Sequence, residues 1–155
     1  MERPAAGNLC AVGNLRTSTP PPEARELKAW VLNTTAELRA LRANLHQALT
    51  GHPLVAGECL DDIPERVVLV ATELAANGIR HGRPPTVIRL LCTDDEFVLD
   101  VADHDRQHLP ELADTRPIDA GGRGLLIAQS FSLEVGWYAT DHTKHIWASF
   151  PRAVA

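Results

Sequence analysis

The stretch VVLVATELAANGIRHG, residues 67–82, decides the fold of this chain. Its apolar side chains recur at helical spacing and predict a helix that packs on a sheet: Val67, Val70, Ala71, Leu74 and Ala75. Glu73, Asn77 and His81 follow one another along a different edge of the same helix. Such a polar line fits an ordinary solvated face as well as a functional site. Asn within an apolar helix is a poor helix former, which favours function.

Flanking residues indicate where this helix begins and ends. Asp62 can cap the first turn, Glu65 follows at the spacing of a capping box, and Pro64 suits a first turn. Gly82 and the Pro84-Pro85 pair are expected to stop the helix.

The segments before this helix predict a strand and a second helix. Residues 27–32 have the length and content of a first strand at a sheet edge. Residues 33–35 supply capping oxygens for a helix that runs to about Leu49. A row of leucines would face the core from that helix: Leu38, Leu41, Leu45 and Leu49. Residues 50–60 predict a loop, because they contain Gly and Pro.

The segments after the helix predict two hairpins separated by a loop and a third helix. Residues 86–92 and 96–102 form the first hairpin, and residues 133–140 and 144–150 form the second. The polar connection between the hairpins, residues 103–120, is long enough to be a lid or a binding loop. It leads into a helix that begins near Leu125 and ends near Phe131.

Composition limits the classes of protein that this chain can represent. A length of 155 residues suits one domain, with residues 1–24 as a flexible arm or partner-binding tail and residues 25–155 as the folded part. The formal charge of −5 and the absence of a Lys/Arg run argue against nucleic acid and membrane as direct partners. The chain lacks a secretory pattern, and its odd, scattered cysteines suit reduced thiols in a cytoplasm: Cys10, Cys59 and Cys92.

The glycine-rich turn at residues 121–124 could bind an anion. Glycine lets a backbone approach a ligand closely, and the free N–H groups of a helix start favour phosphate. The turn is a weak signal alone, because glycines before a helix are often only a loop end. It gains weight from the Glu73 and Asn77 pair and from Asp103, which ends an apolar strand.

Four stretches together resemble the GHKL ATPase superfamily, which includes gyrase, heat-shock chaperones, histidine kinases and mismatch-repair ATPases. Residues 73–82, ELAANGIRHG, resemble the N box of that superfamily. Asp103 with the downstream Leu109-Pro110 resembles the first glycine box, and residues 122–125, GRGL, resemble the second. Residues 146–148 are similar to the last strand. Over residues 27–150 the sequence most resembles the anti-sigma factor serine-protein kinases of bacteria.

This resemblance implies a fold and two cofactors. The fold is an α/β (α+β) two-layer sandwich, the Bergerat ATP-binding fold, whose mixed, mostly antiparallel sheet carries helices on one face. The cofactors are ATP and Mg²⁺. Glu73 would be the general base that takes a proton from a serine hydroxyl or water, and Asn77 would hold the metal. Asp103 would accept a hydrogen bond from adenine, residues 105–120 would form the lid, and the phosphates would meet Gly122, Arg123, Gly124 and Leu125.

Two residues depart from the family pattern. Asp105 stands where the first glycine box normally has its glycine, and His145 occupies the place of a threonine that usually helps the aspartate to bind adenine. Both changes are expected to fall on the adenine pocket, and neither on Glu73 or Asn77. They predict weaker nucleotide binding rather than loss of function.

Three functions compete at this point. The leading hypothesis is an anti-sigma factor and serine kinase that binds a sigma factor and phosphorylates an antagonist protein, with pairing of two copies through the first strand. The alternative is a non-catalytic binding module of the same fold with weak or no ATP binding. The third hypothesis is a metal site, although a flexible loop is a poor scaffold for its ligands: Asp103, His104, Asp105 and His108.

Overall fold

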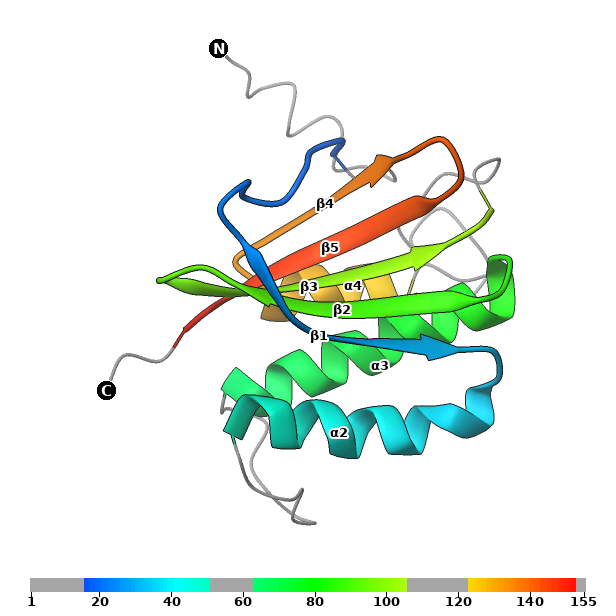
Figure 1. The fold of residues 1–155 in the computed structure, drawn as a ribbon, viewed down its shortest axis with the longest axis horizontal. Helices are drawn as coiled ribbons and strands as arrows, with labels where there is room; N and C mark the ends of the chain where they lie inside the picture. The colour runs from blue at the N-terminus through cyan, green and yellow to red at the C-terminus, as the bar shows by residue number, and fades with distance from the viewer. Residues whose placement is uncertain (1–15, 51–62, 106–122, 153–155) are drawn as a thin grey trace.

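A single open sheet organises the molecule. The computed structural model describes residues 16–50, 63–105 and 123–152. Its strands follow the order β1-β2-β3-β5-β4 (Figure 1), with these bounds: β1 (Arg25–Leu32), β2 (Thr86–Cys92), β3 (Glu96–Asp103), β4 (Glu134–Ala139) and β5 (Lys144–Pro151). All pairings between these strands are antiparallel, and β1 lies at one edge. Both predicted hairpins and the predicted edge strand are therefore confirmed.

Three helices cover one face of the sheet (Figure 1): α2 (Leu38–Thr50), α3 (Ile63–His81) and α4 (Arg123–Phe131). A short 3₁₀ turn, η1 (Thr35–Glu37), leads into α2 and is closed by a capping box on Thr34. Helix α3 packs against α2, α4, β2 and β3. Its predicted apolar stripe is buried, which confirms α3 as the central helix: Val67, Val70, Ala71, Leu74 and Ala75. This two-layer arrangement confirms the predicted α+β class.

A buried contact between a histidine and a glutamate joins α2 to α3. His46 Nε2 of α2 lies 2.8 Å from Glu65 Oε2 of α3, and both side chains are almost fully enclosed. The sequence predicted only a helix-capping role for Glu65. Asp62, its predicted partner in the capping box, lies outside the described residues, so that role stays a prediction. The contact between His46 and Glu65 instead shows how the first turn of α3 is held against α2.

The sheet face opposite the helices is covered by the chain that precedes β1. Residues 16–24, here called the N-terminal strap, run from the β4 edge towards β1 (Figure 1). The Ser18 N–H donates to the Trp137 carbonyl of β4 at 2.9 Å, and Trp147 Nε1 of β5 donates to the Ser18 carbonyl at 2.9 Å. Ala24 packs against a small apolar cluster on the same face, which consists of Leu91, Val98 and Trp147. The strap therefore belongs to the folded structure.

Two further predictions concern thiols and membranes. Cys92 is buried and free, whereas Cys10 and Cys59 lie outside the described residues. In the part of the chain that the structure describes, no helix has both the length and the apolar character needed to cross a bilayer.

Candidate functional site

The polar edge of α3 is accessible. Glu73 and Asn77 are half-buried, and His81 at the end of the helix is exposed. Glu73 and Asn77 fall outside the buried apolar stripe because they lie on a different side of the helix. Within residues 16–50, 63–105 and 123–152, neither side chain forms a hydrogen bond or an ion pair. Both therefore present free oxygen atoms to a ligand.

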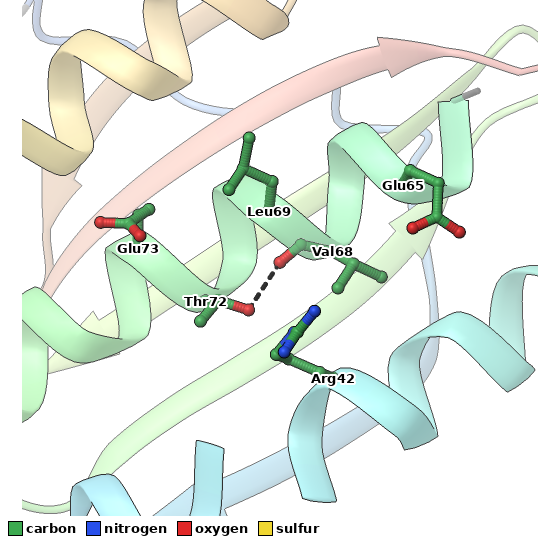
Figure 2. A pocket seen from close by; sticks show the side chains of 6 residues that line it. All are labelled: Arg42, Glu65, Val68, Leu69, Thr72 and Glu73. Carbon is green, nitrogen blue, oxygen red and sulfur yellow. Dashed lines mark hydrogen bonds between the residues drawn. The ribbon is translucent and has the colours of Figure 1, made fainter. Parts of the chain in front are cut away.

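Glu73 also lines a hollow between α2 and α3, with a volume of 230 Å³ (Figure 2). The other lining residues are Arg42, Glu65, Val68, Leu69 and Thr72. Arg42 reaches across from α2, while Thr72 Oγ1 donates to the Val68 carbonyl at 2.7 Å and so turns back onto its own helix. Glu73 stands at the end of the hollow away from Glu65 (Figure 2). A group that enters the hollow can approach the Glu73 carboxylate along α3.

Asp103 lies at the other end of the polar edge, where β3 meets the end of α3. A Cβ atom on Gly82 would lie 2.5 Å from both Cγ and Oδ2 of Asp103, so the two residues are in close contact. The His104 N–H donates to the Arg83 carbonyl at 3.1 Å and ties the two segments together. The Asp105 N–H donates to Asp103 Oδ1 at 2.7 Å, and both aspartates are buried.

The Asp103 carboxyl group is partly desolvated. Burial raises the pKa of the Asp103 carboxyl above its ordinary value, although the Asp105 N–H and the Lys144 ammonium lower this pKa. Lys144 Nζ lies 3.7 Å from Asp103 Oδ2, and the two side chains are 10% and 9% exposed. A buried carboxylate beside a cation is suited to recognise the hydrogen-bonding edge of a ligand.

The polar side chains are spread along α3. Glu73 and Gly82 are nine residues apart, which corresponds to about 13 Å along a helix axis. Asn77 lies between them on the same helix. Asp103, which contacts Gly82, therefore lies well beyond Asn77 as seen from Glu73.

The glycine-rich motif is described only in part. Gly122 lies outside the described residues, while Arg123 and Gly124 form the first turn of α4, which packs against α3. Leu125 is 2% exposed and belongs to the main core, so only its backbone is available to a ligand. The predicted lid, apart from Asp105, also lies outside the described residues. The roles of this motif stay predictions.

The prediction that His145 lies beside Asp103 is wrong. His145 pairs with Ala102, whereas Lys144 pairs with Asp103. Because side chains alternate between the faces of a strand, His145 points to the face opposite the helices and Lys144 points to the helix side. Lys144, one residue before His145, is therefore the β5 residue beside Asp103.

His145 belongs instead to a polar network on the strap-side face. Its centre is Asp100, which is fully buried and accepts a 2.6 Å hydrogen bond from the Tyr138 hydroxyl. His145 Nδ1 lies 2.8 Å from Asp100 Oδ1, and Arg89 lies 3.4 Å from Asp100 Oδ2. Burial and the hydrogen bond to Asp100 raise the pKa of Tyr138. An aspartate within an apolar strand was the only sequence signal for this network.

The geometry of the described residues does not support the hypothesis of a metal site around Asp103. Asp103 Oδ1 already accepts the Asp105 N–H, and His108 lies outside the described residues. Across the described ranges, no group of three or more His, Cys, Asp or Glu side chains is arranged to hold a metal ion.

The contact between Gly82 and Asp103 leads to a prediction. Gly82→Ala would place a Cβ 2.5 Å from Asp103 Oδ2 and 2.7 Å from the Gly78 carbonyl, so backbone or carboxylate must move. We expect a loss of about 1–3 kcal/mol in unfolding free energy, the usual cost of overpacking, and weaker nucleotide binding. Urea unfolding and calorimetric titration measure the two effects. Gly78→Ala is the control, because the atoms nearest to its Cβ would belong to the Thr86 side chain, at 3.1 Å or more. Equal effects of both substitutions would contradict a special role for Gly82.

Comparison with known proteins identifies the class to which this fold and polar edge belong. A family model described as histidine kinase-like ATPase domain matches residues 31–150. The chain therefore belongs to the histidine kinase-like ATPase family. The matched segment begins within β1 and ends within β5, and it includes Glu73, Asn77, Asp103 and the start of α4.

A solved structure supports the fold. The chain is similar to the crystal structure of the RsbU and RsbW domains of Rv1364c from Mycobacterium tuberculosis, with a TM-score of 0.55 and 16% sequence identity. The match covers 83% of this chain and 34% of the other, so this chain spans about a third of that protein. None of the curated proteins matches this chain.

Proposed function

We propose that this protein is an ATP-binding serine-protein kinase that acts as an anti-sigma factor in the cytoplasm. It would bind a sigma factor and phosphorylate an antagonist protein on serine. Membership of the histidine kinase-like ATPase family supports ATP binding. The resemblance of the N box and glycine boxes to anti-sigma factor kinases supports the choice of partners. We also propose residues 25–155 as the kinase domain and residues 1–24 as its N-terminal extension.

One observation carries this proposal. The free carboxylate of Glu73 and the free amide of Asn77 share one edge of α3, and Gly82, just past the end of this helix, contacts the buried Asp103. Oxygen atoms of carboxylates and amides are the ligands that Mg²⁺ takes up. The residues present therefore fit a magnesium nucleotide, with its base at Asp103 and its phosphates along α3.

Each proposed residue has a distinct task. Asp103 accepts a hydrogen bond from the adenine amino group, and Asn77 holds Mg²⁺, which neutralises phosphate charge when bound. Glu73 accepts the proton of the attacking serine hydroxyl. Residues 122–125 meet the phosphates through the backbone N–H groups at the start of α4, where the helix dipole favours negative charge.

The hollow beside Glu73 provides a route for a protein substrate. It opens between α2 and α3, and Glu73 stands at one end of it (Figure 2). A serine side chain that follows this hollow would reach the carboxylate from the side of α2. A second copy of the chain could pair with the edge strand β1, which exposes Leu27 and Val31.

A non-catalytic binding module of the same fold is the second candidate. Asp105 favours the binding module, because this buried aspartate stands where the family has a glycine beside the adenine ring. Such a module would capture its partner without transferring phosphate.

Calorimetric titration with Mg-ATP tests the proposed nucleotide site. We expect saturable binding by the parent and a loss of about tenfold or more in affinity for Asn77→Ala, because a metal-holding oxygen is removed. Asn44→Ala is the matched control, since Asn44 is exposed on α2. No binding by the parent at millimolar nucleotide would reject the site. Binding without transfer to a serine-containing antagonist would favour the binding module.

A further inference from the structure

The strand register places a lysine where the base of the proposed nucleotide would be recognised. Lys144 is the cross-strand partner of Asp103, and its ammonium lies 3.7 Å from Asp103 Oδ2. The Lys144 side chain lies on the helix side of the sheet, because Ala148 on the same face of β5 belongs to the main core. A cation and a carboxylate thus stand side by side at the end of α3.

The two oxygens of the Asp103 carboxylate have different neighbours. The Asp105 N–H occupies Oδ1 at 2.7 Å, whereas Oδ2 faces Lys144 and Gly82. The pair therefore places a carboxylate acceptor beside an ammonium group that carries three N–H donors.

We propose that Lys144 is a specificity-determining residue that reads N1 of adenine while Asp103 reads the exocyclic amino group. This inference rests on the proposed function and deepens it. Adenine presents an amino donor next to the N1 acceptor, which matches one carboxylate oxygen beside one ammonium. Guanine presents an N1–H and an amino group side by side. The N1–H of guanine would face the ammonium, which is itself a donor, instead of offering it an acceptor.

A comparison of ATP with 1-deaza-ATP tests this assignment, because the analogue replaces N1 by a C–H group. We expect the parent to bind 1-deaza-ATP about tenfold more weakly than ATP, since a hydrogen bond to a charged group is lost. In Lys144→Met the ratio of the two affinities is expected to fall close to one. Lys28→Met is the matched control, because Lys28 is exposed on β1, and it should keep the ratio of the parent.

The possible failures are distinguishable. If the parent binds ATP but binds 1-deaza-ATP equally well, this inference is overturned and the proposed nucleotide site stands. That measurement needs no variant, so it holds even if Lys144→Met does not fold. An unchanged ratio in folded Lys144→Met also overturns the inference. If the parent binds no ATP, the proposed function and this inference fail together.

Discussion

Glu73→Gln is expected to reduce phosphate transfer to a serine substrate by about 10²–10⁴-fold, the usual contribution of a general base. Glutamine keeps the size of the side chain but cannot accept the proton. Glu73 lies on the accessible edge of α3 without a partner among the described residues, so stability should change little. Single-turnover transfer of labelled phosphate measures the rate, and calorimetric titration shows that Mg-ATP still binds.

The control for this experiment is Glu23→Gln, the same chemical change at an exposed residue of the N-terminal strap. It should transfer phosphate at the parent rate. If Glu73→Gln also transfers at that rate, Glu73 is not the base. If the parent itself transfers nothing while it binds ATP and its partner, the binding module is the better description.

Asp100→Ala is expected to cause the largest loss of stability, about 3–5 kcal/mol, the cost of removing one partner of a buried charged network. Asp100 is fully buried, and its removal leaves Tyr138, His145 and Arg89 without their shared acceptor. For a domain of this size the loss corresponds to a fall of about 6–20 °C in Tm. Differential scanning calorimetry measures it directly.

The same variant also tests whether the strap-side face of the sheet influences nucleotide binding on the helix side. Because the Asp100 network lies opposite the helices, nucleotide affinity should not change in Asp100→Ala at a temperature where the protein is folded. Asp141→Ala, at an exposed position between β4 and β5, is the control and should leave Tm within about 1 °C. A Tm of Asp100→Ala equal to that of this control would contradict the buried network.

Much of the helix side could be predicted from the sequence. The stripe Val67 to Ala75 has a clear helical period, and the core confirms every position in it. The β2 and β3 hairpin was evident because two apolar runs flank a short acidic turn. The juxtaposition of Asp103 and the α3 end was implied by family resemblance alone. Its physical reason, the close contact with Gly82, needed coordinates.

The strap-side face and the register of β5 could not be predicted. The composition of residues 1–24 predicted a flexible arm, but within residues 16–24 hydrogen bonds to Trp137 and Trp147 hold the chain on the sheet. The buried environment of Asp100 follows from that long-range packing, which local patterns do not encode. A shift of one residue moves a side chain to the other face of a strand. The family resemblance therefore predicted His145 beside Asp103, although Lys144 is the residue that pairs with it.

Backbone amide NMR during titration with Mg²⁺ and a non-hydrolysable ATP analogue tests the nucleotide site most directly. The proposed site extends from Glu73 along α3 to Gly82 and Asp103. We expect the largest shifts at residues 73–82 and 103–105, and little change at Ser18, Tyr138 and Trp147 on the strap side. The absence of shifts at millimolar analogue, or shifts concentrated on the strap side, would contradict a nucleotide site along α3.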